Sequence, residues 1–447
     1  MKIKNGYWPS VSKGTNVLKA QPFAYILKSI LHSERCDYCF DNGKLLKCSG
    51  CHYVQYCNRD CQRDAWNIHK QECINLKRIA PRVIPDAARL MARIIVKLNS
   101  GGGEEKGYYS DHSFRKFKDL MSHYTDIKED KKRMEHFTSL CGVLFEFMGK
   151  SELPNPAELM GIYGKICVNS FNILDSDMNS IGVGIYLSPS ILDHSCKPNA
   201  VAVFEGTKII IRTIVDVPRF EWSQIKISYI DLMNSRDSRQ AELMSTYYFL
   251  CDCEKCKEPE PLTESAICQE ISCSKYCDIS DDNCSHCGKE VSNELREKFE
   301  DARDFTENHL QRMKSMAYID ISKMCLKKQK GVFHPLNLQH VRALESAFDA
   351  SVTLSYWEDA EFYALQLIPG YLHYYEQMHP LTGLLYLLLG KIQMHLGKIK
   401  IAYETLKTSR SILLITHGEN HSVLTKNVIP LLSQAIAEIR GNIPSIC

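Results

Sequence analysis

The residues best suited to chemistry in this sequence are seven cysteines and one histidine that fall in four closely spaced pairs. The pairs are Cys36 with Cys39, Cys48 with Cys51, Cys57 with Cys61, and His69 with Cys73. Zinc takes four thiolate or imidazole ligands in a tetrahedral arrangement, and two ligands at this spacing can hold one ion from a tight turn or from one helical turn. Eight such ligands predict two zinc sites.

Two further cysteine sets follow later in the chain. Cys251, Cys253 and Cys256 are three thiols that need a fourth ligand to complete a zinc site. The last set is spaced like a small zinc knuckle and leaves Cys277 spare: Cys268, Cys273, Cys284 and Cys287. The sequence leaves open whether this set holds a further ion. The cysteines without a cysteine nearby are interpreted as ordinary thiols: Cys141, Cys167, Cys325 and Cys447.

Composition favours metal sites over disulfides. The chain has 20 cysteines in 447 residues, and its first ten residues contain no apolar stretch of the kind found in secretory signals. The apolar run at residues 384–389 is far shorter than the roughly 20 residues of a membrane span. We therefore expect a protein of the cytoplasm and nucleus with no membrane partner, in a reducing compartment where clustered thiols bind metals.

The charge balance argues against a chain-wide surface for nucleic acid. Lys and Arg number 55 against 53 Asp and Glu, which gives a net charge of +2. Residues 28–82 hold ten Lys or Arg against six Asp or Glu, a local excess that a solvated basic face explains. Any contact with DNA is therefore expected to be weak or indirect.

The elements that position these residues are short strands followed by helices. Residues 200–204 and 208–215 are rich in Ile and Val and predict two strands around a turn at 205–207, while residues 59–73 predict a short helix. Helical patterning dominates from residue 291 onward. There, Ala360 and Ala402 stand 42 positions apart, as do His379 and His421, which predicts stacked helix pairs like tetratricopeptide repeats.

Several of these patterns resemble known domains. The pattern from Tyr56 to Cys73 resembles a MYND zinc finger. Residues 193–199 (Asp-His-Ser-Cys-Lys-Pro-Asn), the strand motif at 227–231 and the Cys-x-Cys-x2-Cys tail resemble a SET domain with its post-SET tail. A MYND finger inserted near the start of a SET domain is the arrangement of the SMYD protein-lysine methyltransferases, which the chain resembles over nearly its whole length.

The resemblance implies an α+β fold: a β-rich SET domain split by a MYND finger and a helical insert, then a cysteine-rich post-SET zinc tail and an all-α TPR-like domain. The expected parts are the first part of SET at 1–30, the MYND finger at 31–75, the helical insert at 76–165, the SET core at 166–245, the post-SET region at 246–290 and the helical domain at 291–447.

The resemblance also implies how the zinc ligands are shared. Its two MYND sites are interleaved, with Cys36, Cys39, Cys57 and Cys61 on one ion and Cys48, Cys51, His69 and Cys73 on the other. Cys196 then joins Cys251, Cys253 and Cys256 on a third. Three zinc ions are expected, and a fourth if the set from Cys268 to Cys287 binds metal.

The resemblance further implies the roles of a methyl-transfer site. Tyr229 would orient the lysine amine, Tyr247 would close the lysine channel and Phe171 would face the lysine. S-adenosyl-L-methionine would lie against Phe249, with its remaining parts lined by further residues. These are His123, Asn169, Ser190, Leu192, Asp193 and His194. Methyl transfer itself needs aligned reactants in a dry channel and a neutral amine.

The sequence departs from the SET pattern at three places, one of which is residues 220–223 (Phe-Glu-Trp-Ser) in place of the family's Gly-Glu-Glu. Counting back from residues 22–25 puts the Gly-x-Gly strand that grips the cofactor at residues 1–6, where no such motif stands, so the strand is expected either to be atypical or to lie upstream of Met1. Asp193 replaces the family's asparagine. Two functions therefore stay open: methylation of lysine in a histone or another protein, and a SET and MYND scaffold that binds partners and regulates transcription.

The expected partners follow from the same resemblance. They are a histone or other protein substrate, proline-rich peptides at the MYND finger and a chaperone tail at the helical domain, whose competing role is purely structural. The chain is expected to be a monomer.

Overall fold

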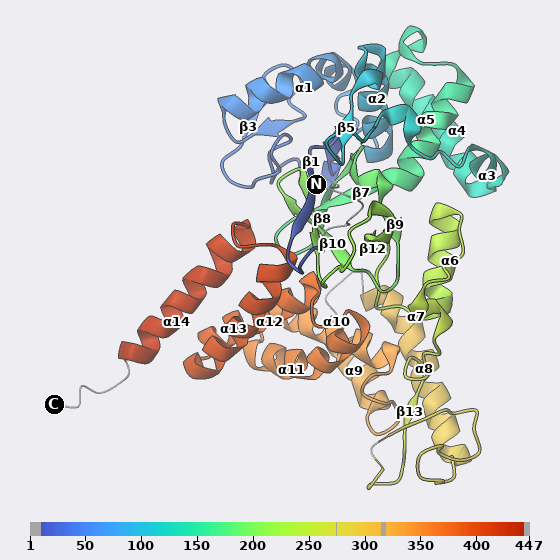
Figure 1. Ribbon diagram of the computed structural model, residues 1–447, viewed down its shortest axis with the longest axis vertical. Coiled ribbons are helices and arrows are strands. Elements are labelled where there is room, and N and C mark those ends of the chain that lie inside the picture. The colour runs from blue at the N-terminus through green and yellow to red at the C-terminus, as the bar shows by residue number, and fades with distance from the viewer. Residues whose placement is uncertain (1–9, 274, 314–318, 442–447) are drawn as a thin grey trace. The chain divides into compact units, whose positions relative to one another are not determined.

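The structure is a computed structural model that describes residues 10–273, 275–313 and 319–441 (Figure 1). The chain divides into two compact units, residues 1–227 with 242–250 and residues 228–241 with 251–447. One of the boundaries, between residues 241 and 242, falls within helix α6 (Arg236–Tyr247). Each unit is described by itself. None of the described helices is both long and apolar enough to cross a membrane.

The first unit is built around two small antiparallel sheets. One has the order β1 (Asn16–Ala20), β11 (Lys208–Thr213), β10 (Ala200–Glu205), and the other has the order β2 (Ala24–Leu27), β8 (Ser180–Ile185), β7 (Ser170–Leu174). The hairpin of β10 and β11 turns at Gly206, whose φ of +58° suits glycine, and it confirms the two strands expected from the Ile and Val pattern. A short parallel pair joins β9 (Asp193–His194) to β12 (Lys226–Ile227).

The glycine-rich strand β8 allows close backbone approach. A Cβ added at Gly182 would lie 2.4 Å from the Phe40 ring and 2.5 Å from the carbonyl oxygen of Ile26. Glycine is therefore needed here so that β2 and the Phe40 side chain can pack against the strand.

The N-terminal segment of the first unit contains a strand, β1, that was not predicted from the sequence. Residues 1–6, where the Gly-x-Gly strand was expected, lie outside the described residues, as does Cys447. The first strand that the structure describes is β1, which pairs with β11, and Gly14 precedes it with φ of +81°. The Gly14 amide donates to the Thr213 carbonyl oxygen at 2.7 Å, so a left-handed glycine leads into this strand.

Helices surround the sheets in the first unit. Helix α1 runs to Ile79, beyond the predicted end at Cys73, because Leu76 and Ile79 are also buried. Helix α1 begins at Arg59. The remaining helices are α2 (Asp86–Asn99), α3 (Tyr124–Glu129), α4 (Lys131–Met148) and α5 (Pro156–Asn169). Two short strand pairs complete the unit: β3 (Leu46–Lys47) with β4 (Gln55–Tyr56), and β5 (Gly107–Tyr108) with β6 (Phe114–Arg115).

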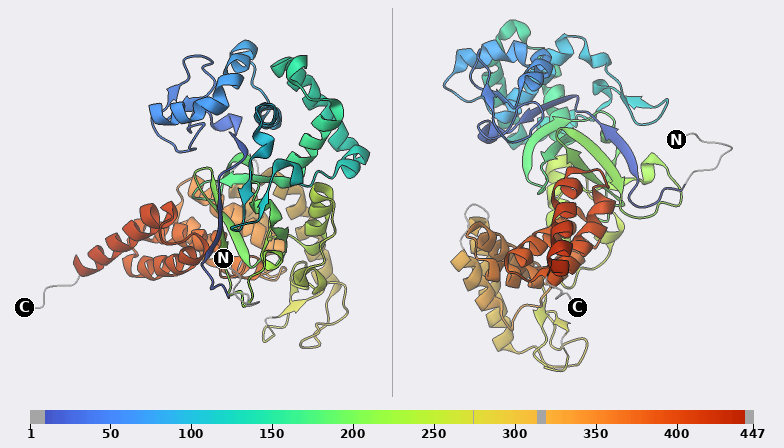
Figure 2. Two further views of the ribbon diagram at one scale, coloured as in Figure 1. Left: turned by 45° about the horizontal axis from the view of Figure 1, so that its top comes forward. Right: turned by 90° about the vertical axis from the view of Figure 1, so that its left-hand side faces the viewer.

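The second unit is mostly helical, as the sequence predicted. Its elements are α7 (Glu254–Lys257), β13 (Ala266–Ile267), β14 (Tyr276–Cys277), α8 (Asn293–Met313), α9 (Ile319–Gln329), α10 (Leu338–Thr353), α11 (Trp357–Tyr374), α12 (Pro380–His395), α13 (Ile399–Thr416), a π-helical turn (Val423–Val428) and α14 (Ile429–Gly441). Consecutive helices from α10 to α14 pack on one another (Figure 2). The repeat offset of 42 matches this arrangement, since Ala360 and Ala402 lie in the first turns of α11 and α13.

Glycines bring two of these helices into close contact. Cβ atoms added at Gly383 and Gly390 of α12 would lie 2.7 Å from Leu413 and 2.6 Å from Leu406, two buried leucines of α13. This close packing explains why α12 tolerates two glycines in its interior despite their cost to helix formation.

Candidate metal centres and functional site

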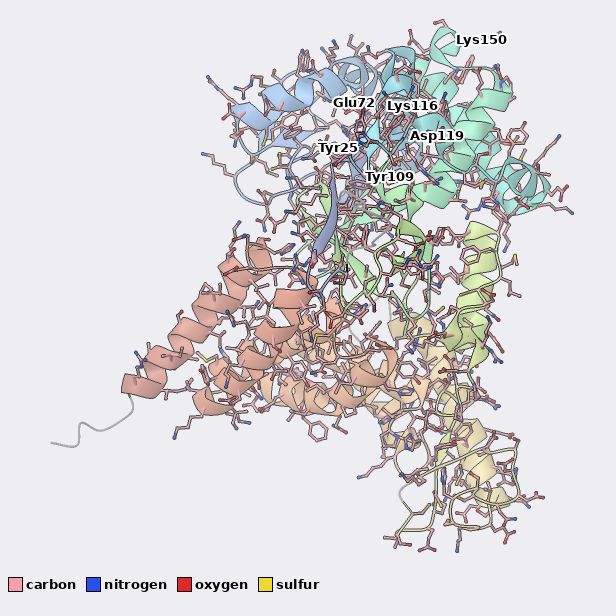
Figure 3. The ribbon with its side chains drawn as sticks, in the orientation of Figure 1. Tyr25, Glu72, Tyr109, Lys116, Asp119 and Lys150 are labelled. Carbon is pink, nitrogen blue, oxygen red and sulfur yellow. The ribbon has the colours of Figure 1, made fainter. Side chains whose placement is uncertain are left out.

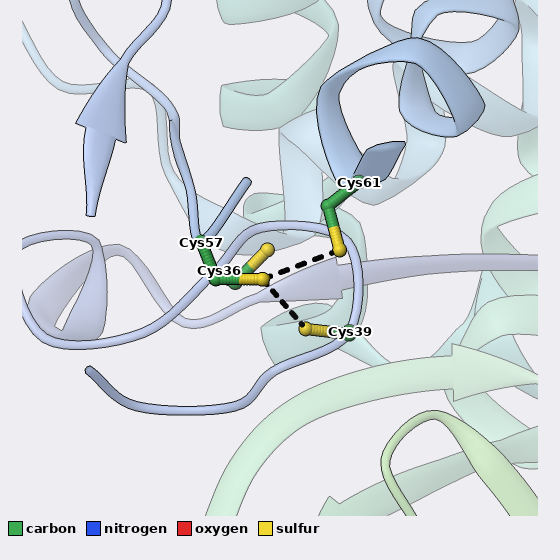
Figure 4. Close-up of side chains that lie close together, drawn as sticks. All are labelled: Cys36, Cys39, Cys57 and Cys61. Carbon is green, nitrogen blue, oxygen red and sulfur yellow. Dashed lines mark hydrogen bonds between the residues drawn. The ribbon is translucent and has the colours of Figure 1, made fainter. Parts of the chain in front are cut away.

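The MYND region brings its eight predicted ligands together in the two interleaved groups. In the first group, the Cys57 sulfur lies 3.7 Å from that of Cys39 and 3.3 Å from that of Cys61, with Cys36 completing the set (Figure 4). In the second, the Cys48 and Cys73 sulfurs are 3.8 Å apart. Tetrahedral zinc with Zn–S bonds near 2.3 Å separates two sulfurs by roughly 3.8 Å, so both groups fit zinc.

Local backbone structure presents these thiols. The chain turns tightly after Cys36 and Cys48, where the amides of Phe40 and His52 donate to the Cys36 and Cys48 carbonyl oxygens at 3.0 and 2.9 Å. Both Phe40 and His52 have positive φ, as such turns require. Helix α1 begins with an N-cap, because Asn58 accepts a hydrogen bond from the Cys61 amide at 2.8 Å.

Within the first group, one thiolate is favoured before any metal binds. A hydrogen bond from the Cys39 thiol lowers the pKa of Cys36 to about 5, although burial opposes the change. The hydrogen bond with Cys36 raises the pKa of Cys39, and burial raises that of Cys61 to about 12. Because zinc binds the thiolate form, uptake of the ion releases protons from this group.

A buried ion cluster, formed by Asp37, Glu72, Arg89 and Arg93, supports the second group. His69 points its Nε2 atom to the Cys51 sulfur, 3.5 Å away, while its Nδ1 atom lies 3.0 Å from Glu72. A carboxylate at this place fixes the ring orientation and the tautomer of a zinc-binding histidine. Figure 3 shows Glu72 in the first unit near Tyr25, whose carbonyl oxygen accepts a hydrogen bond from Arg93 at 2.6 Å.

The cluster pairs two carboxylates with two guanidinium groups. Arg89 donates to Asp37 at 2.8 and 2.9 Å and to Glu72 at 2.7 and 3.2 Å. Burial alone would raise the pKa values of Asp37 and Glu72, but Arg89 and Arg93 of α2 hold both below their usual range. The finger is therefore joined to α2 by charged groups that are almost wholly buried.

The three thiols of the predicted post-SET tail lie together in the second unit. The sulfur atoms of Cys251, Cys253 and Cys256 are within 4.8 Å of one another, and Cys253 is the N-cap residue of α7. The Arg239 guanidinium donates to the Cys256 sulfur at 3.9 Å. Cys196 belongs to the first unit, where it is buried 3.2 Å from His194 Nε2, and its role as the fourth ligand stays a prediction.

The segment 193–199 is held by the parallel strand pair. Asp193 and His194 are in register with Lys226 and Ile227, and Lys226 pairs with the Asp193 carboxylate at 2.9 Å. Asn199, at the end of the segment, helps to hold the two strands together. Its side-chain oxygen accepts a hydrogen bond from the Lys226 amide, and its Nδ2 atom donates to the Gln224 carbonyl oxygen, both at 2.7 Å. The carboxylate that replaces the family's asparagine is therefore charge-paired.

Residues 247–249 bring several predicted site residues together. The Phe249 ring lies 6.0 Å from the His194 ring and 6.5 Å from the Tyr247 ring. Tyr248, which has φ of +61°, places its ring 5.3 Å from that of His123, itself in the left-handed region with φ of +44°. Burial raises the pKa of Tyr247, which keeps its hydroxyl protonated and able to donate a hydrogen bond.

The other predicted residues of the first unit lie on neighbouring elements. Asn169, at the end of α5, donates to the Met121 and Lys165 carbonyl oxygens, both at 2.8 Å. The Arg115 guanidinium binds the carbonyl and hydroxyl oxygens of Ser190 at 3.1 and 3.3 Å. Leu192 is 2% exposed, and Phe171 in β7 contacts the Tyr186 ring edge to face at 5.7 Å.

Tyr229 lies two residues after the end of β12, which agrees with the expected position near the end of a strand. It is half-buried and stands two positions after Ile227, the residue in register with His194. Tyr229 belongs to the second unit, so its proposed role rests on its position in the sequence motif.

The sequence reasoning missed three contributors to the site. Asn199 was quoted only as the end of a motif, although an asparagine before a strand commonly binds backbone groups. Tyr248 and Arg115 carry no local signal, because their partners His123 and Ser190 are far away in the sequence.

Comparisons with known proteins agree with this architecture. The family model for the MYND finger matches residues 36–73. Histone-lysine N-methyltransferase SMYD3 of Mus musculus is 30% identical over 96% of this chain and 94% of its own, and SMYD3 of Homo sapiens is likewise 30% identical over 96% and 94%. Histone-lysine N-methyltransferase ASHR1 of Arabidopsis thaliana is 27% identical over 95% and 91%.

These relatives and the site define a class, the zinc-carrying protein-lysine N-methyltransferases. Their similarity extends over almost the whole chain and includes both the finger and the helical region. The chain belongs to the SMYD family.

Proposed function

We propose that this chain transfers a methyl group from S-adenosyl-L-methionine to a lysine side chain of a histone or another protein. The observation that carries the proposal is the contact of Phe249 with His194, beside a strand pair that leads directly to Tyr229. These residue types match the positions at which the SET pattern holds its cofactor and lysine.

The residues present fit the proposed cofactor. Phe249 offers an aromatic face for the adenine ring, and the Asn169 side-chain oxygen can accept a hydrogen bond from an ammonium group, because the described contacts of Asn169 use only its Nδ2 atom. When bound, this cofactor supplies an electrophilic methyl group on a sulfonium. Asp193, His194, Ser190, Leu192 and His123 would line its remaining parts, as the family pattern implies.

The remaining chemistry falls to the two tyrosines. Tyr229 would accept and orient the neutral amine through its hydroxyl, and Tyr247 would close a narrow channel that excludes water and aligns the amine for attack. Phe171 would contact the apolar stem of the lysine. No strong general base is needed once the amine has lost its proton.

The N-terminal loop would contribute backbone contacts. We assign to Gly14 the place of the family's first glycine, with Asn16 in place of the second, since Gly14 has positive φ immediately before β1. Close backbone approach to a ligand is a common reason for glycine in such a turn.

Zinc in this proposal is structural. Two ions would lie in the MYND finger, and Cys251, Cys253 and Cys256 would hold a third with Cys196 as the predicted fourth ligand, giving at least three ions per chain. The finger would bind proline-rich peptides, the helical domain would bind a chaperone tail, and the protein would act as a monomer in the cytoplasm and nucleus.

Calorimetric titration of the zinc-loaded chain with S-adenosyl-L-methionine tests the proposal without a known substrate. Binding with a dissociation constant near the micromolar range, about 8 kcal/mol, is expected. A folded chain that shows no binding would instead be a SET and MYND scaffold.

Tyr229→Phe then separates catalysis from binding. The variant should bind the cofactor with unchanged affinity and lose methyl transfer by roughly a hundredfold or more, since it lacks only the hydroxyl that orients the amine. Tyr356→Phe, at an exposed position of the second unit, is the matched control and should retain full turnover. Unchanged turnover in Tyr229→Phe would remove this residue from the mechanism.

A further inference from the structure

The second unit contains a group of four thiols that neither methyl transfer nor the post-SET tail uses. They are Cys268, Cys273, Cys284 and Cys287, whose sulfur atoms all lie within 4.8 Å of one another. The Cys268 and Cys287 sulfurs are 3.6 Å apart, and those of Cys273 and Cys284 are 3.9 Å apart. Both distances are close to the roughly 3.8 Å edge of a tetrahedral zinc–thiolate site and far beyond the length of a disulfide.

Each half of this group is a tight turn that presents two thiols. The strand pair of β13 and β14 brings the chain back on itself, so that the Cys268 amide donates to the Lys275 carbonyl oxygen at 2.9 Å. In the other half, the Gly288 amide donates to the Cys284 carbonyl oxygen at 2.8 Å, and Gly288 has φ of +75°. The glycine lets the backbone turn directly after Cys287.

Hydrophobic burial alone is a weak account of this region. Its core is small and has ten buried residues from the cysteine region, α8 and the chain around residue 332. They are Ala266, Cys268, Cys277, Cys284, Val291, Leu295, Phe299, Ala302, Val332 and Phe333. The strands here have two residues each. Segments with so small a core are commonly stabilised by a metal or a disulfide, and the sulfur–sulfur distances of 3.6 and 3.9 Å within this group are too long for a disulfide.

We propose that these four thiols bind a zinc ion, separate from the MYND and post-SET sites, and that this ion fixes residues 264–292 onto the start of α8. Two chain segments depend on it. Residues 282–291 lead into α8, with the Val291 amide donating to the Asp282 carbonyl oxygen at 2.9 Å, and β13 joins residues 332–334, with the Ile267 amide donating to the Val332 carbonyl oxygen at 2.9 Å. The ion closes the loop between these two attachments.

The fifth thiol of the region has a different role. Cys277 is 3% exposed and belongs to the apolar core, whereas the ligand Cys287 is exposed. An exposed cysteine next to three partly or fully buried ones is the pattern of a metal site that opens to solvent on one side. Cys277 is therefore assigned to packing and provides an internal control for the ligands.

Metal analysis of purified full-length chains tests the assignment. The wild-type chain should hold four zinc ions, Cys284→Ser with Cys287→Ser should hold three, and Cys277→Ser should keep four. Hydrogen exchange of peptides covering 264–299 should be faster by about two orders of magnitude or more in the double variant, because a structural zinc contributes much of the local folding free energy. Exchange in the finger at 36–73 should not change.

Alkylation of the wild-type chain keeps the proposal testable if the double variant does not fold. In the zinc-loaded chain Cys287 should resist iodoacetamide despite its exposure, and a chelator should make it react at the rate of the denatured chain. A count of three ions together with rapid alkylation of Cys287 in the loaded chain would overturn the proposal. An unchanged zinc count in the double variant would overturn it as well.

Discussion

Replacing Arg89 by methionine should loosen the MYND finger far more than any change to its surface charges. Methionine keeps much of the side-chain volume but removes the guanidinium that bridges Asp37 and Glu72. The cluster then holds two carboxylates against Arg93 alone. Because Glu72 also orients His69, the loss reaches the second zinc group.

The structure sets the size of the effect. Arg89 is 1% exposed and makes four hydrogen bonds to carboxylate oxygens, so both carboxylates lose a buried partner. Removing one member of a buried ion pair costs about 3 to 5 kcal/mol, because the remaining charge is left uncompensated. At 1.4 kcal/mol for each factor of ten, local opening of the finger should become roughly a hundredfold to several thousandfold more frequent.

Hydrogen exchange measured by mass spectrometry on peptides from 36–73 reports this opening directly. Free zinc must be held constant, since ligand binding stabilises the folded form by mass action. The control is Arg63→Met, because Arg63 pairs with Asp60 at 2.7 Å but is about 70% exposed, and such pairs contribute about 1 kcal/mol or less.

A second substitution tests the charge argument itself. Adding Asp37→Asn to Arg89→Met leaves one carboxylate facing one guanidinium, so the double variant should regain part of the lost protection. The reasoning is refuted if Arg89→Met exchanges no faster than Arg63→Met, or if the second change deepens the loss.

Three other outcomes are expected. Gly390→Ala should destabilise the helical domain by about 1 to 2 kcal/mol in thermal unfolding, because the added Cβ would meet Leu406. The control is Gly142→Ala in α4, where the added Cβ has open space and should stabilise the first unit by up to about 1 kcal/mol. Burial raises the pKa of Glu345 to about 7. Between pH 4.5 and pH 7 the folded chain therefore keeps a proton on Glu345 that the unfolded chain has lost. The free energy of unfolding falls as the pH rises through this range. Glu345→Gln should therefore raise the free energy of unfolding by at most about 3 kcal/mol at pH 8 and not at pH 4, seen as a higher melting temperature at pH 8 only. The exposed control Glu419→Gln should change the melting temperature at neither pH. Asn199→Ala should weaken cofactor binding in calorimetry, because it removes the hydrogen bonds to the Lys226 amide of β12 and to the Gln224 carbonyl oxygen just before β12. Equal affinity would contradict that role.

Zinc ligands were predictable because their spacing is local. Pairs such as Cys36 and Cys39 lie within one turn of the chain. To form a tetrahedral zinc site, the surrounding fold has only to bring two such pairs together. The hairpin at 200–213 was predictable for the same reason, since β-branched residues flank a short turn with glycine.

Long-range partners could not be read in this way. Asp37 and Arg89 are 52 positions apart, and each looks like an ordinary surface charge in the sequence. The prediction ended α1 at the last zinc ligand, Cys73, although Leu76 and Ile79 continue its apolar spacing and Pro81 follows two residues after its end.

The interleaving of the finger's two ligand groups makes its folding all or none. The stretch between Cys39 and Cys57 contains Cys48 and Cys51, and the stretch between Cys51 and His69 contains Cys57 and Cys61. Each ion therefore closes the loop that positions ligands of the other ion. When either ion is lost, that loop regains its conformational entropy, and binding of the remaining ion has to order the loop alone. Metal uptake should be cooperative, and a truncated finger with only one ligand group should have no stable half-folded form to occupy.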